Sequence, residues 1–236
     1  MFSSTRSKLA AAGAAAIVIA GGSYGIVTAT SSSASVTPAA SSSPTGGSGT
    51  GGGSNARSGP AAGGSSGTVG SVSTSGFIIT TSAGQKVTVK EASSTTYQKG
   101  TASTSASAIT AGEPVLVLGT TSSTTITATR VTVQPAGSEG SAASTAAGVV
   151  PFQKGAPATS KTVGQIPADY TQGSGTLASG TTANRATEAT LAAYPGGVVD
   201  RVVELSKGDY EVHYIGVNWP HHIFVSQDFK VIGANA

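Results

Sequence analysis

The stretch VVDRVVELSKGDYEVHYIGV, residues 198–217, carries the clearest structural pattern in the chain. Two runs rich in β-branched and aromatic residues, 198–205 and 210–217, are separated by the turn-forming residues 206–209, as in a β-hairpin. In the second run tyrosine and valine alternate with other side chains. The tyrosine-valine face of this strand is therefore expected to pack against the rest of the fold.

The residues around this hairpin complete a small α+β unit. Upstream, Thr182 can cap a helix that runs to about Tyr194, and the sequence PGG at 195–197 ends it. Downstream, a further strand region is expected over residues 222–232. Residues 181–236 are thus predicted to form one helix packed on an antiparallel sheet. The helix is expected to bury one stripe of residues, namely Ala183, Thr187, Thr190, Leu191 and Tyr194.

Three motifs in this region resemble the PepSY domain of the bacterial cell envelope. They are YPGGVV at 194–199, GDYEV at 208–212 and the closing hairpin from Phe224-Val225 to Val231-Ile232. The resemblance implies a helix on a small antiparallel sheet, and it implies a link with the regulation of extracellular peptidases.

A second module is expected at residues 68–136. Five short β-branched runs recur there at roughly ten-residue spacing, which is typical of a small all-β unit and suggests an OB-like barrel. The runs are 68–72, 77–81, 86–90, 114–118 and 126–133. The sequences at 67–97, 109–120 and 125–133 also resemble an actinobacterial extracytoplasmic domain of unknown function, which implies no catalytic residues.

The segments 30–67 and 137–180 are predicted to be disordered linkers. Both are dominated by Gly, Ser, Ala and Thr and lack hydrophobic periodicity, so little in them can be buried cooperatively. The whole chain has 33 glycines among 236 residues, and this composition argues against a single large core. The predicted fold class is therefore multi-module, with a small all-β domain and a small α+β domain joined by Gly/Ser/Ala linkers.

The first 29 residues predict an export element. Arg6 and Lys8 precede an uncharged, mostly apolar run over residues 9–29, which can serve as a cleaved signal peptide or as a retained membrane anchor. Either outcome places the rest of the chain outside the cytoplasm, secreted or anchored by a single span. The membrane is a partner only if the segment is retained.

Composition and motifs argue against catalysis, cofactors and nucleic acid. The chain has no cysteine, which excludes thiol chemistry and Cys-based zinc sites. The glycines at 47, 49 and 52 lack the acidic residue that a dinucleotide loop requires about twenty residues later. The net charge of +3 comes from scattered single residues, so no nucleic-acid surface is expected.

Three histidines within ten residues form the candidate metal site, namely His213, His221 and His222. Adjacent residues on a strand point to opposite faces, so only one of His221 and His222 is expected to join His213. A metal site would then need Glu211 or Asp200 as a further ligand. The alternative interpretation is that these histidines are ordinary polar residues of strands and loops.

The leading hypothesis is an exported, non-catalytic envelope protein whose C-terminal module has an interaction or regulatory role. Its partner would be another extracytoplasmic protein, such as a peptidase, and the expected contact residues are Trp219, Tyr214 and Glu211. Two alternatives are a histidine-based metal-binding or sensing envelope protein and a passive structural spacer.

Overall fold

The structure is a computed structural model of the 236-residue chain, and it describes residues 59–136, 162–216 and 220–235. All of these residues fall within one compact unit, Gly49–Ala236. The expected export element, most of the first expected linker, most of the second and Trp219 lie outside the described residues. In the part of the chain that is described, no helix has the length and apolar character needed to cross a membrane.

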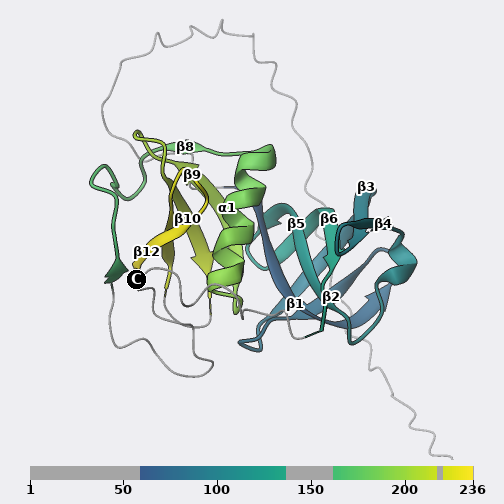
Figure 1. Ribbon diagram of the computed structural model, residues 1–236. Coiled ribbons are helices and arrows are strands. Elements are labelled where there is room, and N and C mark those ends of the chain that lie inside the picture. The colour runs from purple at the N-terminus through teal and green to yellow at the C-terminus, as the bar shows by residue number, and fades with distance from the viewer. Residues whose placement is uncertain (1–58, 137–161, 217–219, 236) are drawn as a thin grey trace, which may run out of the picture. The chain divides into compact units, whose positions relative to one another are not determined.

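The described residues are mostly β-structure with one α-helix (Figure 1). The elements, in chain order, are β1 (Ala61–Ser73), β2 (Gly76–Thr80), β3 (Lys86–Lys99), β4 (Ala102–Thr104), the 3-10 helix η2 (Ala106–Ala108), β5 (Pro114–Ser122), β6 (Thr125–Val133), β7 (Thr162–Gly164), β8 (Thr176–Leu177), α1 (Gly180–Ala193), β9 (Val198–Glu204), β10 (Tyr210–Ile215), β11 (His222–Val225) and β12 (Val231–Asn235).

The first five long strands close on themselves. β1 pairs with both β2 and β5, β2 pairs with β3, and β6 lies between β3 and β5, parallel to β3 and antiparallel to β5. Their inward-facing side chains form one hydrophobic core, which includes Phe77, Ile79, Val89, Val117 and Ile126. Period-2 alternation explains this core, because every second residue of each strand points inward.

The C-terminal strands form an antiparallel array in the order β9, β10, β11, β12, β7, and β8 pairs with the other edge of β9. The helix α1 packs on one face of this array (Figure 1). The predicted helix stripe is confirmed, since Ala183, Thr187, Thr190, Leu191 and Tyr194 are all buried. They pack against Val202, Val212, Tyr214 and Ile223, which belong to the second hydrophobic core.

β1 joins these two sets of strands into one sheet of twelve strands. Gly64 pairs with Val199 and Ser65 with Val198 of β9, while the same part of β1 pairs with β5 on its other side. Two side chains reinforce the junction, since Ser65 Oγ donates to the carbonyl of Gly197 and Thr81 Oγ1 donates to that of Gly196, both at 2.8 Å.

The prediction of two separate modules is therefore wrong. The described residues form a single large mixed sheet with one helix, mostly β, rather than a small PepSY-like α+β module beside an independent OB-like barrel. The error originates in residues 61–67, which were expected to belong to a linker but form the first half of β1. Residues 162–180, also expected in a linker, contain β7, β8 and the first residue of α1.

Small side chains make the junction possible. A Cβ atom on Gly63 would lie 2.0 Å from the carbonyl oxygen of Val199, and one on Gly64 would lie 2.3 Å from that of Val117. Only glycine permits so close an approach of neighbouring backbones. The small residues of this segment, which predict disorder from the sequence, are therefore the residues that allow β1 to lie between two strands.

We expect Gly63→Ala to lower the free energy of unfolding by about 1–3 kcal/mol, because the added methyl group must push β1 and β9 apart. The control is Gly70→Ala in the same strand, where the nearest atom to the new Cβ, the carbonyl oxygen of Ile78, is 3.6 Å away. The control should change stability by about 0.5 kcal/mol or less. Urea unfolding curves give both values, and equal effects of the two substitutions would contradict the proposed role of the junction.

Candidate functional site

All three histidines meet at one place on the C-terminal sheet. His213 of β10 is the cross-strand partner of His222, the first residue of β11. His221 precedes the strand, so the alternation of strand side chains does not apply to it. The ring centres of His213 and His221 are 4.4 Å apart, those of His221 and His222 are 5.0 Å apart, and those of His213 and His222 are 5.4 Å apart. The expectation that only two of the rings can meet is therefore wrong.

Two carboxylates are hydrogen-bonded to two of these rings. Nδ1 of His213 lies 2.5 Å from Oδ1 of Asp200, and Nδ1 of His222 lies 2.7 Å from Oε1 of Glu211. An ionised carboxylate only accepts hydrogen bonds, so each Nδ1 is a donor, and in the neutral form of either ring Nε2 is the unprotonated nitrogen.

A register shift in the sheet places Asp200 beside His213. On β9, Arg201 pairs with His213 and Val199 pairs with Tyr214, so Asp200 is left over between the two pairs. Such a bulge changes the direction in which a side chain points. Glu211 needs no irregularity, because it lies two residues before His213 on the same strand and on the same face.

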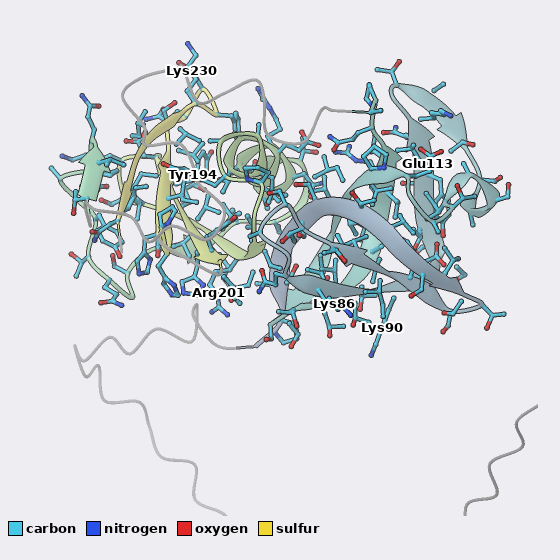
Figure 2. All side chains as sticks on the ribbon, turned by 90° about the horizontal axis from the view of Figure 1, so that it is seen from below. Lys86, Lys90, Glu113, Tyr194, Arg201 and Lys230 are labelled. Carbon is cyan, nitrogen blue, oxygen red and sulfur yellow. The ribbon has the colours of Figure 1, made fainter. Side chains whose placement is uncertain are left out.

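The cluster extends from the core toward the surface. Glu211 is fully buried, the side chain of His222 is 6% exposed, that of His213 is 21% exposed, and His221 is an exposed residue. The buried guanidinium of Arg201 lies 3.3 Å from Oδ2 of Asp200. Figure 2 shows Arg201 on the side of this region opposite Tyr194, which lies near the helix.

Electrostatics favour the neutral form of the outermost ring. The pKa of His221 is lowered, first by desolvation and then by the neighbouring charges of His213 and His222, while Asp200 and Glu211 oppose the shift. Desolvation is the larger cause, and the other two imidazoles add to it because a positive charge on one ring disfavours a charge on its neighbours.

The segment between β7 and β8 covers part of this face. The ring of Tyr170 lies edge-on to Phe224, at 4.7 Å between centres, and 6.0 Å from the ring of His222. The neighbouring Asp169 accepts hydrogen bonds from Ser206 Oγ and from the backbone N–H of Lys207, both at 2.8 Å. The bond from Ser206 is the main reason why the pKa of Asp169 is lowered.

Part of this site follows from the sequence. The three histidines and the two acids Asp200 and Glu211 are predicted there, whereas Tyr170 falls in an expected linker and no role is predicted for Arg201. The signals that could have indicated them are the aromatic residue at position 170 and the Asp-Arg pair at the start of the first hairpin strand.

The expected partner-binding residues are not exposed together. Tyr214 and Glu211 are both fully buried, and the hydroxyl of Tyr214 donates to the carbonyl oxygen of Tyr194 at 2.8 Å. These two side chains therefore offer no surface to a partner in this structure. Trp219 lies outside the described residues.

The three imidazoles lie near one another, but their side chains are not arranged as metal ligands. Across residues 59–136, 162–216 and 220–235, no group of three or more His, Asp or Glu side chains is already placed so that it could hold a metal ion. The three ring centres are nevertheless only 4.4 to 5.4 Å apart. Three nitrogens bound tetrahedrally at about 2.0–2.1 Å from a zinc ion put their ring centres about 5 Å apart.

Comparison with known proteins adds no further assignment. No protein-family model matches the chain, and neither a curated protein nor a solved structure is significantly similar to it. The PepSY resemblance and the link with peptidases therefore stay predictions from the sequence.

We expect His222→Ala to lower the free energy of unfolding by about 3–5 kcal/mol, because the buried Glu211 loses the imidazole to which it is bonded. The matched control is His221→Ala, which removes an exposed ring and should cost about 0.5 kcal/mol or less. Denaturant titration of the two variants beside the parent chain measures the difference. A His222→Ala variant as stable as the control would show that the Glu211–His222 pair does not contribute to folding.

Proposed function

We propose that this chain is an exported, non-catalytic protein that binds a divalent transition-metal ion through His213, His221 and His222. The observation that carries the proposal is the meeting of three imidazoles whose ring centres are 4.4 to 5.4 Å apart, two of them bonded to carboxylates through Nδ1. The export of the chain is supported by the sequence of its first 29 residues.

The carboxylates support this assignment as strongly as the rings do. A histidine that binds a metal almost always donates its other N–H to a carboxylate, a carbonyl or water, which fixes the ring and makes the ligating nitrogen more basic. Asp200 and Glu211 provide this contact for His213 and His222. The Nε2 atoms of these two rings are then the nitrogens that would bind the metal.

The donor set selects the class of metal. Imidazole nitrogen suits zinc, copper and nickel, whereas magnesium and calcium prefer carboxylate and carbonyl oxygens. In this cluster each carboxylate already accepts a hydrogen bond from a histidine, and the chain has no cysteine. We therefore expect selectivity for zinc, copper or nickel over magnesium and calcium.

We expect the full chain to bind one zinc ion per molecule in a calorimetric titration, and to show no heat with magnesium. The chain has three histidines in all, so metal-induced shifts of histidine ring signals in NMR report on this cluster alone. His221→Ala should weaken zinc binding by about tenfold or more, a loss of about 1.4 kcal/mol or more of binding free energy. Absence of zinc binding by the parent chain would rule out the proposed function.

We further expect Asp200→Asn to weaken zinc binding by about 10- to 100-fold, because His213 loses the carboxylate that orients its ring. Asp228→Asn is the matched control, since it removes the same charge from an exposed turn between β11 and β12. Calorimetry compares the three dissociation constants. Equal weakening in both variants would indicate a general charge effect instead of a positioning role for Asp200.

A further inference from the structure

We propose that the outer face of β1, β2 and β3 binds an extended acidic polysaccharide chain. The proposal does not rest on the histidine cluster, which belongs to β10, β11 and the residue before β11. On β3 the side chains of Lys86, Thr88 and Lys90 are exposed, because the valines between them are buried in the core of the N-terminal strands. Ile78 of β2 pairs with Thr88 on one side and with Ser71 of β1 on the other. Three strands therefore contribute neighbouring side chains to this face.

A hollow of about 280 Å³ lies on this face, and its lining includes Ser71, Ser73, Ser75, Ile78, Thr88 and Lys90. Ser73 Oγ donates to the carbonyl of Gly76 at 2.8 Å. In the described part of the chain, the hydroxyls of Ser71, Ser75 and Thr88 make no hydrogen bond. The side chain of Ile78 beside them belongs to a residue that is 38% exposed. Free hydroxyls next to a small apolar surface suit a sugar, which has hydroxyl groups at its rim and C–H groups on its ring faces.

The charge on this face is positive. Lys86 and Lys90 are both exposed, and neither forms an ion pair within the residues that the structure describes. Residues 59–136 contain two acids. One is Glu91, which follows Lys90 on the opposite face of β3 and accepts a hydrogen bond from the hydroxyl of Tyr97 at 2.8 Å. The other is Glu113, which Figure 2 shows far from both lysines. The face therefore attracts anionic groups.

The spacing of the lysines favours a polymer over a small anion. Lys86 and Lys90 are four residues apart on one strand, which puts their Cα atoms about 13 Å apart, so they would pair with two acidic groups of an extended chain. Surfaces that bind anionic membranes through charge carry clusters of about four to eight cations, whereas this face has two. Single-stranded nucleic acid binds where bases stack on aromatic side chains, and none of the exposed side chains on this face is aromatic. A polysaccharide with carboxylates fits both the charge and the hydroxyl-lined hollow.

The test follows the amide NMR signals of the isotope-labelled full chain during titration with oligogalacturonate, a sugar chain with a carboxylate on each ring. Dextran, a neutral glucan, and poly-L-glutamate, which has carboxylates but no sugars, are titrated in parallel. We expect saturable shifts of the β1, β2 and β3 signals with oligogalacturonate alone. Lys86→Gln/Lys90→Gln should weaken binding by about tenfold, and Thr88→Val by about two- to tenfold. The matched double variant Lys99→Gln/Lys230→Gln removes two exposed lysines elsewhere and should bind as the parent chain does.

Absence of a saturable shift with oligogalacturonate would overturn the proposal. Equal weakening of binding in the two double variants would do the same, because it would indicate general charge attraction instead of this face. Binding of poly-L-glutamate with the same affinity would show that carboxylates suffice and that no sugar is recognised. A last titration uses vesicles of phosphatidylcholine and phosphatidylglycerol, and shifts with these vesicles but not with oligogalacturonate would assign the face to a membrane. Zinc binding by the histidines is measured separately, so failure of this proposal leaves the proposed function intact.

Discussion

The pairing of β1 with β9 is the constraint on which the rest of the structure depends. Two side-chain hydrogen bonds support it, one from Ser65 to the carbonyl of Gly197 and one from Thr81 to the carbonyl of Gly196. Without this contact the chain would have two small sheets, each with a free edge that can pair with other molecules. With this contact, the two small hydrophobic cores stabilise one continuous sheet. Their combined burial offsets the conformational entropy that is lost when many small residues become ordered.

The histidine cluster depends on the same sheet at a finer scale. Its rings meet because β10 and β11 pair in a register that sets His213 opposite His222, and because the bulge at Asp200 turns a carboxylate toward them. A slip of one residue in either pairing would move the rings to opposite faces. Backbone pairing of β10 with β11 thus sets the positions of His213 and His222, whereas His221 precedes β11.

The burial of Asp200 and Glu211 is not explained by stability. Burying a carboxylate is costly, and a buried pair often contributes no more than apolar side chains of similar size would. Apolar residues at positions 211 and 222 would fill the same space without desolvation. The pair does fix the orientation of an imidazole, which apolar residues cannot do.

Periodicity and turn residues are sufficient to predict the local elements, namely the C-terminal hairpin, the buried stripe of α1 and the β-branched strands of the N-terminal part. The three histidines are also recognised as a candidate site from the sequence, because they lie within ten residues of one another. The folded chain is needed to see that residues 61–67 are a strand, that the two halves share one sheet, and that Asp200, Arg201 and Tyr170 surround the histidines. The reason is physical. Glycine and serine give no hydrophobic periodicity, so a segment of them that must lie between two close backbones is recognised only when the neighbouring strands are known. A bulge depends on how two strands pair, and the local sequence of one strand does not show that pairing.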